Sequence, residues 1–147
     1  MMTSCKQVRI AAINCRGVKG RVDKINEFVR REKEIGIIVL SETWLRVGEE
    51  APRFAEFEVV IDERGVIGEG ASRASGGLLI IARVGMKITR GSSNREMAIV
   101  SVGDINIIGC YFKPYNSENN EVGRNKDKQM DCSFFELDIT KVVRGGE

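Results

Sequence analysis

The chain has 147 residues, of which 42% are hydrophobic, so it can build one ordinary domain with a core and is not a low-complexity or disordered chain. Its 23 basic and 21 acidic residues leave a formal charge of +2, which excludes a strong overall attraction to nucleic acid or to an anionic membrane. Histidine is absent, so Ser-His-Asp and Cys-His nucleophile systems are excluded and a general base would have to be Asp, Glu, Lys or Tyr.

The cysteines and the amino terminus indicate the cellular compartment. Four cysteines without a Cys-x-x-Cys pair argue against a zinc site and favour free thiols in a reducing compartment. The apolar stretch at residues 8–13 is too short for the core of a signal peptide or for a membrane span. We expect an intracellular protein, nuclear or cytoplasmic and not secreted, without a membrane partner; the sequence identifies no protein partner.

Two short apolar runs near the amino terminus predict buried strands. They span residues 8–13 and 37–40 and are followed by Asn14 and Glu42. Between them, apolar positions at helical spacing predict a crossover helix over residues 20–35, with Gly36 as its stop. A right-handed crossover makes the two strands parallel, so Asn14 and Glu42 should meet at one edge of the sheet. Amide and carboxylate oxygens suit hard cations such as Mg²⁺, which predicts a metal and phosphate site.

The segment after Trp44 predicts shorter strands over residues 56–62, 77–83, 86–90, 95–102 and 105–112. Residues 91–94 and the pair Gly103-Asp104 are typical hairpin connections, and the second favours positive backbone angles. We therefore expect an antiparallel meander after the parallel pair. The glycine-rich residues 65–77 lack Gly-Lys-Ser/Thr, so we interpret them as a flexible hairpin loop and not as a phosphate cradle.

The carboxyl-terminal part predicts an exposed loop over residues 113–128 and then a closing helix. The helix is predicted from the near-helical spacing of Met130, Phe134, Leu137 and Lys141. The whole chain, residues 1–147, is then a single mixed α/β domain. It looks incomplete at its carboxyl end, because a helix with no following strand is an unusual end for a parallel unit.

Four short motifs resemble, in order and spacing, those of the endonuclease/exonuclease/phosphatase superfamily. They are Ile-Asn-Cys-Arg-Gly-Val at 13–18, Leu-Ser-Glu-Thr-Trp-Leu at 40–45, Ser-Gly-Gly-Leu at 75–78, and Tyr111 with Pro114. The resemblance is greatest to the apurinic-like endonuclease domain of non-LTR (LINE-type) retrotransposons and covers nearly the whole chain. It implies the amino-terminal part of a DNase I-like fold, a partial four-layer α/β sandwich with mixed sheets and outer helices, truncated at the carboxyl end. It also implies DNA as the substrate and nicking as the reaction.

The resemblance also implies roles for particular residues. Glu42 matches the glutamate that binds the catalytic Mg²⁺, for which Mn²⁺ could substitute, and Asn14 matches the asparagine beside that metal. Tyr111 matches a tyrosine whose hydroxyl contacts the scissile phosphate, and Asn116 stands near a substrate-contacting asparagine that follows it. We therefore expect Asn14, Glu42 and Tyr111 to be the catalytic residues.

Basic residues near this predicted site are candidate phosphate contacts. Lys19 and Arg21 follow the first strand, and Lys113 lies two positions after the tyrosine. Arg16, by contrast, occupies a position where apurinic endonucleases carry an acidic residue, and its charge excludes a direct role in metal binding.

The family's later Gly-Asp-Phe-Asn and Ser-Asp-His motifs are missing, because the sequence stops before the first of them. Mg²⁺ held by one carboxylate and one amide should be weakly bound. An aligned general base contributes about 10² to 10⁴ in rate, so we expect little turnover from this chain alone.

Other interpretations remain open. The chain could be a non-catalytic remnant that serves as an interaction module, or a fragment of a related sugar-phosphate or inositol-phosphate phosphatase or RNA deadenylase. Glu42 could be a solvated strand end, and Asn14 could cap the turn into the helix. For Trp44 we favour packing under the loop after the second strand, with its indole nitrogen hydrogen-bonded, over stacking on a base.

Overall fold

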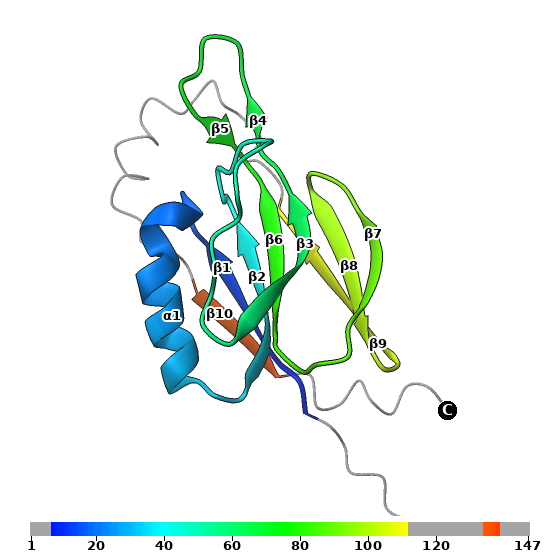
Figure 1. The fold of residues 1–147 in the computed structure, drawn as a ribbon. Helices are drawn as coiled ribbons and strands as arrows, with labels where there is room; N and C mark the ends of the chain where they lie inside the picture. Colours follow the sequence, from blue (N-terminus) through cyan, green and yellow to red (C-terminus); the bar gives the residue numbers. More distant parts are fainter. Residues whose placement is uncertain (1–6, 112–133, 139–147) are drawn as a thin grey trace, which may run out of the picture.

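The computed structural model describes residues 7–111 and 134–138, which form two packed β-sheets, a small hairpin and one α-helix (Figure 1). The larger sheet has the order β10-β1-β2-β6-β3, and its strands are β1 (Arg9–Asn14), β2 (Ile35–Ser41), β3 (Phe57–Glu63), β6 (Leu78–Arg83) and β10 (Phe134–Asp138). The smaller sheet contains β7 (Thr89–Ser93), β8 (Met97–Val102) and β9 (Ile105–Cys110). The hairpin pairs β4 (Val66–Ile67) with β5 (Ala74–Ser75). Within these ranges, no helix combines the length and the apolar character that crossing a membrane requires.

The parallel pair predicted from the two apolar runs is confirmed. β1 and β2 run parallel, with Asn14 paired to Ser41 at their carboxyl-terminal ends. A 3₁₀ turn, η1 (Val18–Arg21), and helix α1 (Val22–Arg31) connect them. The predicted helix over residues 20–35 is therefore too long, because residues 35 and 36 belong to the buried strand β2.

The prediction that Gly36 stops the helix is wrong, because this glycine has a packing role inside β2. A Cβ atom at Gly36 would lie 2.6 Å from the sulfur of Met86, so the strand needs a residue without a side chain at this point. Burial of the neighbouring isoleucines, at roughly 1.5 to 3 kcal/mol each, outweighs the helical spacing that extended the prediction.

The larger sheet buries both of its faces. One face carries Ile13, Ile38 and Leu40, which pack with Ile25 and Val29 of α1 in one core. The opposite face packs against the inner side chains of β8 and β9 in a second core, whose members include Ile10, Ile37, Val39, Ile80, Val100 and Ile107. Figure 1 shows the resulting layers, with α1 on one side of the larger sheet and β7 to β9 on the other.

The predicted meander is correct only for the smaller sheet. β3 and β6 do not continue it, because they join the larger sheet antiparallel to each other, with β6 beside β2. The predicted turn at residues 91–94 is wrong, since residues 91–93 lie in β7 and the predicted strand 86–90 begins only at Thr89. The turn starts at Asn94, whose Oδ1 accepts the backbone N–H groups of Glu96 and Met97, each at 2.9 Å. The Gly103-Asp104 connection is confirmed, and Gly103 has φ 59°.

The predicted closing helix is wrong where the structure describes it. Residues 134–138 form strand β10, antiparallel to β1, with Ile10 paired to Leu137. Without β10, one side of β1 would present unsatisfied backbone groups, and aromatic residues such as the pair at 134–135 favour strands. The remaining parts of that prediction, the loop predicted at 113–128, and the site candidates Lys113 and Asn116 lie outside the described residues.

Candidate active site

Backbone hydrogen bonds keep the chain segments that follow β1 and β2 side by side. The N–H of Cys15 donates to the carbonyl of Ser41 at 2.8 Å, and the N–H of Gly17 donates to the carbonyl of Glu42 at 2.8 Å. The side chains of Asn14 and Glu42 therefore leave the sheet at the same edge, as the two apolar runs predict.

Asn14 presents an amide oxygen that is not satisfied by the described part of the protein. Its side chain leaves the face of β1 that also carries Ile10 and Ala12, which is the face toward the smaller sheet. Oδ1 is buried and has no hydrogen-bond partner among the described residues. A buried, unsatisfied polar group costs about 1 to 3 kcal/mol, so this oxygen is well suited to accept a ligand. The helical connection has Gly17 as its N-cap, so the alternative cap role for Asn14 is wrong.

Glu42 is positioned by an unusual backbone conformation. Glu42 and Trp44 both have positive φ angles, 53° and 58°, which residues with side chains rarely adopt. This conformation lets the indole Nε1 of Trp44 donate to Oε2 of Glu42 at 2.6 Å. Glu42 is therefore a partly buried, hydrogen-bonded carboxylate and not a solvated strand end.

Trp44 is held in place on its ring as well as at its nitrogen. A Cβ atom at Gly17 would lie 2.9 Å from Cε3 of the ring, so only glycine fits against it. The guanidinium carbon of Arg73 lies 3.8 Å from the ring centroid, a cation–π contact. The predicted packing of Trp44, with its indole nitrogen hydrogen-bonded, agrees with this arrangement.

Tyr111 brings the smaller sheet to the site. It directly follows β9, and its phenol lies close enough to Glu42 for that carboxylate to raise the pKa of the phenol. Partial burial raises the pKa of the Tyr111 phenol, and the hydrogen bond and negative charge of Glu42 raise it further, whereas the positive charge of Arg16 acts in the opposite direction. The phenol therefore stays protonated near neutral pH and donates a hydrogen bond, so Tyr111 is not a general base.

Lys19 and Arg21, the two basic candidates that the structure describes, make different contacts. The ammonium group of Lys19 pairs with the carboxylate of Glu49 at the rim of a hollow beside Trp44. Nε of Arg21 donates to the backbone carbonyl of Cys15 at 3.2 Å and so supports the turn after β1. Of the two, Lys19 lies where an anion could reach it.

Several residues around Trp44 were not anticipated from the sequence. Arg46, Glu49 and Arg73 line the hollow beside Trp44, yet no local motif marks them. The hydrogen bond between Trp44 and Glu42, by contrast, could be predicted from the local sequence. An indole donor two positions after a carboxylate can reach back to it when the backbone between them turns sharply.

The oxygen ligands at this site fit Mg²⁺ better than zinc. Within residues 7–111 and 134–138, no three side chains of the types Cys, Asp, Glu and His gather into a metal-binding group. The available donors are the buried amide oxygen of Asn14 and the carboxylate of Glu42. Mg²⁺ accepts such a small set, because it keeps several of its waters and takes further oxygens from phosphate.

Comparison with known proteins finds similarity to solved structures and not to known sequences. No family model matches it, and no curated protein sequence does. It is similar to the structure of a 3′-5′ exonuclease (NExo) from Neisseria meningitidis, with a TM-score of 0.52 and 16% identity over 82% of this chain and 48% of that chain. Two further similar structures are the 3′ phosphatase NExo from Neisseria bound to a product DNA hairpin (TM-score 0.48, 17% identity, 71% of this chain and 41% of that chain) and an AP endonuclease from Archaeoglobus fulgidus (TM-score 0.49, 17% identity, 71% of this chain and 40% of that chain).

The fold is therefore the mixed α/β, DNase I-like fold, in agreement with the fold class predicted from the sequence. The chain spans less than half the length of each of these three proteins.

Proposed function

We propose that this chain carries the amino-terminal part of a Mg²⁺-dependent phosphodiesterase site that acts on DNA, of the kind found in the apurinic-like endonucleases of non-LTR retrotransposons. The observation that carries the proposal is the unsatisfied, buried Oδ1 of Asn14 at the same sheet edge as Glu42, which Tyr111 also contacts. A fold shared with a 3′-5′ exonuclease supports a nucleic acid as the substrate class.

Each of the three side chains has a distinct task in this proposal. Glu42 and Asn14 hold the metal ion through their oxygens, and Mn²⁺ can replace Mg²⁺. When bound, the ion neutralises charge on a phosphate oxygen and lowers the pKa of a bound water. Tyr111 keeps its proton, and its single O–H group turns from Glu42 to a phosphate oxygen when substrate binds, while Trp44 holds the Glu42 carboxylate in place. Turnover by the chain alone is slow, because none of these groups is an aligned general base.

A fluorescence titration tests the metal site directly. The chain has one tryptophan, and its indole nitrogen is bonded to Glu42, so a metal ion at this carboxylate should change its emission. We expect a saturable change with Mg²⁺ that Glu42→Gln abolishes. The matched control is Glu58→Gln, which removes an exposed carboxylate from β3 and should leave the titration unchanged. The proposal fails if the wild type gives no saturable response, or if Glu42→Gln responds as the wild type does.

A second candidate function, a non-catalytic binding module of the same fold, is favoured by a different observation. Glu42 already accepts the indole N–H of Trp44 at 2.6 Å and lies beside the protonated phenol of Tyr111, which can satisfy its charge without a metal ion. If this alternative holds, labelled duplex DNA should bind equally well in Mg²⁺ and in EDTA. Under the phosphodiesterase proposal, Mg²⁺ strengthens DNA binding, and Glu42→Gln removes the difference.

A further inference from the structure

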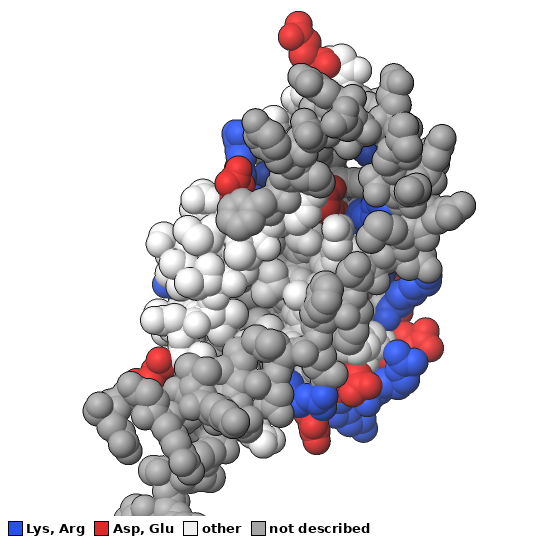
Figure 2. Space-filling model, turned by 180° about the vertical axis from the view of Figure 1, so that it is seen from behind, with Lys and Arg blue, Asp and Glu red and all other residues white. Residues whose placement is uncertain are grey.

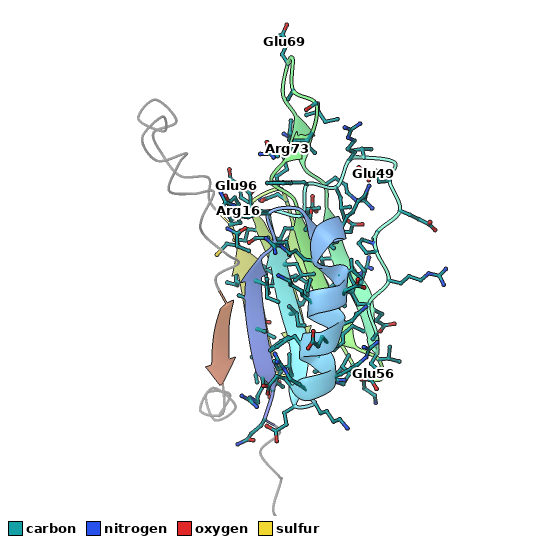
Figure 3. All side chains as sticks on the ribbon, turned by 90° about the vertical axis from the view of Figure 1, so that its left-hand side faces the viewer. Arg16, Glu49, Glu56, Glu69, Arg73 and Glu96 are labelled. Carbon is teal, nitrogen blue, oxygen red and sulfur yellow. The ribbon has the colours of Figure 1, made fainter. Side chains whose placement is uncertain are left out.

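A hollow of about 410 Å³ lies next to the candidate active site and shares the Trp44 side chain with it. One side of the hollow is the turn after β1, with Gly17, Lys19 and Gly20; the other is the connection after β2, with Thr43, Arg46 and Glu49. Arg73, from the β4–β5 hairpin, completes it. Figure 3 shows Arg73 and Glu49 at the same end of the molecule as Arg16, where the strands of the parallel pair end.

The charges around this hollow favour an anion. Three cationic side chains, Lys19, Arg46 and Arg73, line it together with a single carboxylate, Glu49. Lys19 is 65% exposed and Arg46 is 49% exposed, so both can reach a ligand that enters from solvent. Arg73 is exposed as well, and its guanidinium covers the ring of Trp44.

Glu49 occupies the donors that an anion would use. Its Oε1 accepts the backbone N–H of Arg46 at 3.0 Å, and its Oε2 pairs with the ammonium group of Lys19. The guanidinium Nε of Arg46 lies 3.9 Å from Oε1. The hydrogen bond from Lys19 and that from the Arg46 backbone lower the pKa of Glu49, so it is ionised at neutral pH. An ammonium group, a backbone N–H and a guanidinium together form a donor set that also suits a phosphate group.

The geometry points to a second anion subsite in this hollow, which binds a backbone phosphate of a nucleic-acid strand. A neighbouring phosphate of the same strand would lie at Glu42 and Tyr111. In the absence of nucleic acid, the Glu49 carboxylate occupies the subsite and competes with the phosphate. The identity of this anion as a DNA phosphate rests on the proposed function. The Glu49 carboxylate is 22% exposed and its partner Lys19 is 65% exposed, so the ion pair is open to water on the Lys19 side, where such pairs are weak and are screened by salt. The shared wall formed by Trp44 allows one strand to occupy both sites.

DNA binding without metal tests this subsite separately from the metal site. A fluorescently labelled oligonucleotide is titrated in EDTA, and binding is followed by anisotropy over a range of salt concentrations. We expect Glu49→Gln to tighten binding by about three- to tenfold, because the competing carboxylate is lost. Lys19→Gln should weaken binding and reduce the salt slope by about one.

The matched control is Glu50→Gln, which removes the same charge from an exposed neighbour that does not line the hollow. Tighter binding by Glu49→Gln than by Glu50→Gln supports the subsite, and equal effects of the two variants overturn it. Glu42→Gln should retain the Glu49 effect in EDTA, so loss of the Mg²⁺ response alone would count against the proposed function and not against this subsite.

Inorganic phosphate is an alternative ligand for this subsite, because it carries the same anionic oxygens as a DNA phosphate. Inorganic phosphate is titrated while Trp44 fluorescence is followed, and then the oligonucleotide is added as a competitor. Displacement of phosphate by the oligonucleotide supports a DNA subsite. Phosphate binding that depends on Glu49 but is not displaced by the oligonucleotide would overturn DNA as the ligand.

Discussion

Glu42 is oriented by its hydrogen bond from Trp44. The contribution of this hydrogen bond to metal binding can be tested by removing the indole N–H group alone. Trp44→Phe keeps a ring against Gly17 and under Arg73 but removes the N–H that donates to Oε2 of Glu42. We expect metal affinity to fall by about 10- to 100-fold, as it does when a hydrogen bond that orients a metal ligand is lost. Binding of Mn²⁺, followed by electron paramagnetic resonance, measures this without the tryptophan.

The control for this prediction is a variant that removes a different contact of Trp44, one that does not involve the Glu42 carboxylate. Arg73→Gln removes the cation from the ring but leaves the indole N–H in place. It should have little effect on Mn²⁺ affinity. If Trp44→Phe binds Mn²⁺ as tightly as Arg73→Gln does, the indole hydrogen bond has no part in metal binding.

The raised pKa of Tyr111 has a consequence at alkaline pH. A phenol normally loses its proton near pH 10, and in the folded protein burial and Glu42 hold the proton to higher pH. The protonated phenol therefore stabilises the fold fully below about pH 10, and this contribution is lost as the pH rises toward the higher folded pKa. Urea unfolding at a series of pH values should show stability falling above about pH 10 in the wild type and falling less in Tyr111→Phe. Identical pH profiles would contradict the raised pKa of Tyr111.

At the scale of elements, the connection after β2 is locked against the start of β6. The N–H groups of Thr43 and Trp44 donate to the carbonyls of Gly77 and Gly76, at 3.4 and 2.9 Å. Both glycines have positive φ angles, 77° at Gly76 and 98° at Gly77. This contact fixes the loop that carries Glu42.

Two glycine substitutions separate backbone strain from steric conflict at that contact. A Cβ atom at Gly77 would lie 2.2 Å from Oγ1 of the buried Thr43, whereas one at Gly76 would meet nothing within 4 Å. We expect Gly76→Ala to cost about 1 kcal/mol of unfolding free energy through strain, and Gly77→Ala to cost at least about 3 kcal/mol because the loop must also move. Urea denaturation measures both, and equal losses would show that the contact with Thr43 is not tight.

The elements differ in how far the sequence predicts them. β1 and β2 are predictable because both faces of each strand are buried, so they appear as unbroken apolar runs that end at the site. β10 is not, because a five-residue strand whose partner lies far away in the sequence can show the same spacing of apolar residues as a helix. Asn14 and Glu42 were found because they follow predictable strands, whereas Glu49 and Arg73 come from connections whose path depends on tertiary contacts.

At the scale of the whole molecule, the two sheets leave one apolar surface outside. Alternation in β8 and β9 sends Ala98, Val100 and Ile107 inward, while their neighbours in sequence point outward. The outward residues form the cross-strand pairs Met97–Cys110, Ile99–Ile108 and Ser101–Asn106. In Figure 2, the side of the molecule that carries the smaller sheet shows mainly uncharged side chains.

This outer face should make the protein bind apolar dyes and associate with itself. Ile108 is 56% exposed at the centre of the face, with Met97 38% exposed nearby. Ile108→Lys should lower the fluorescence of bound anilinonaphthalene sulfonate and reduce association in concentration-dependent light scattering, while changing the unfolding free energy by no more than about 0.5 kcal/mol. The matched control is Val47→Lys, which adds the same charge at a valine that is 84% exposed on the connection after β2. If Val47→Lys reduces dye binding and association as much as Ile108→Lys does, the effect comes from net charge and not from a contiguous apolar surface on β8 and β9.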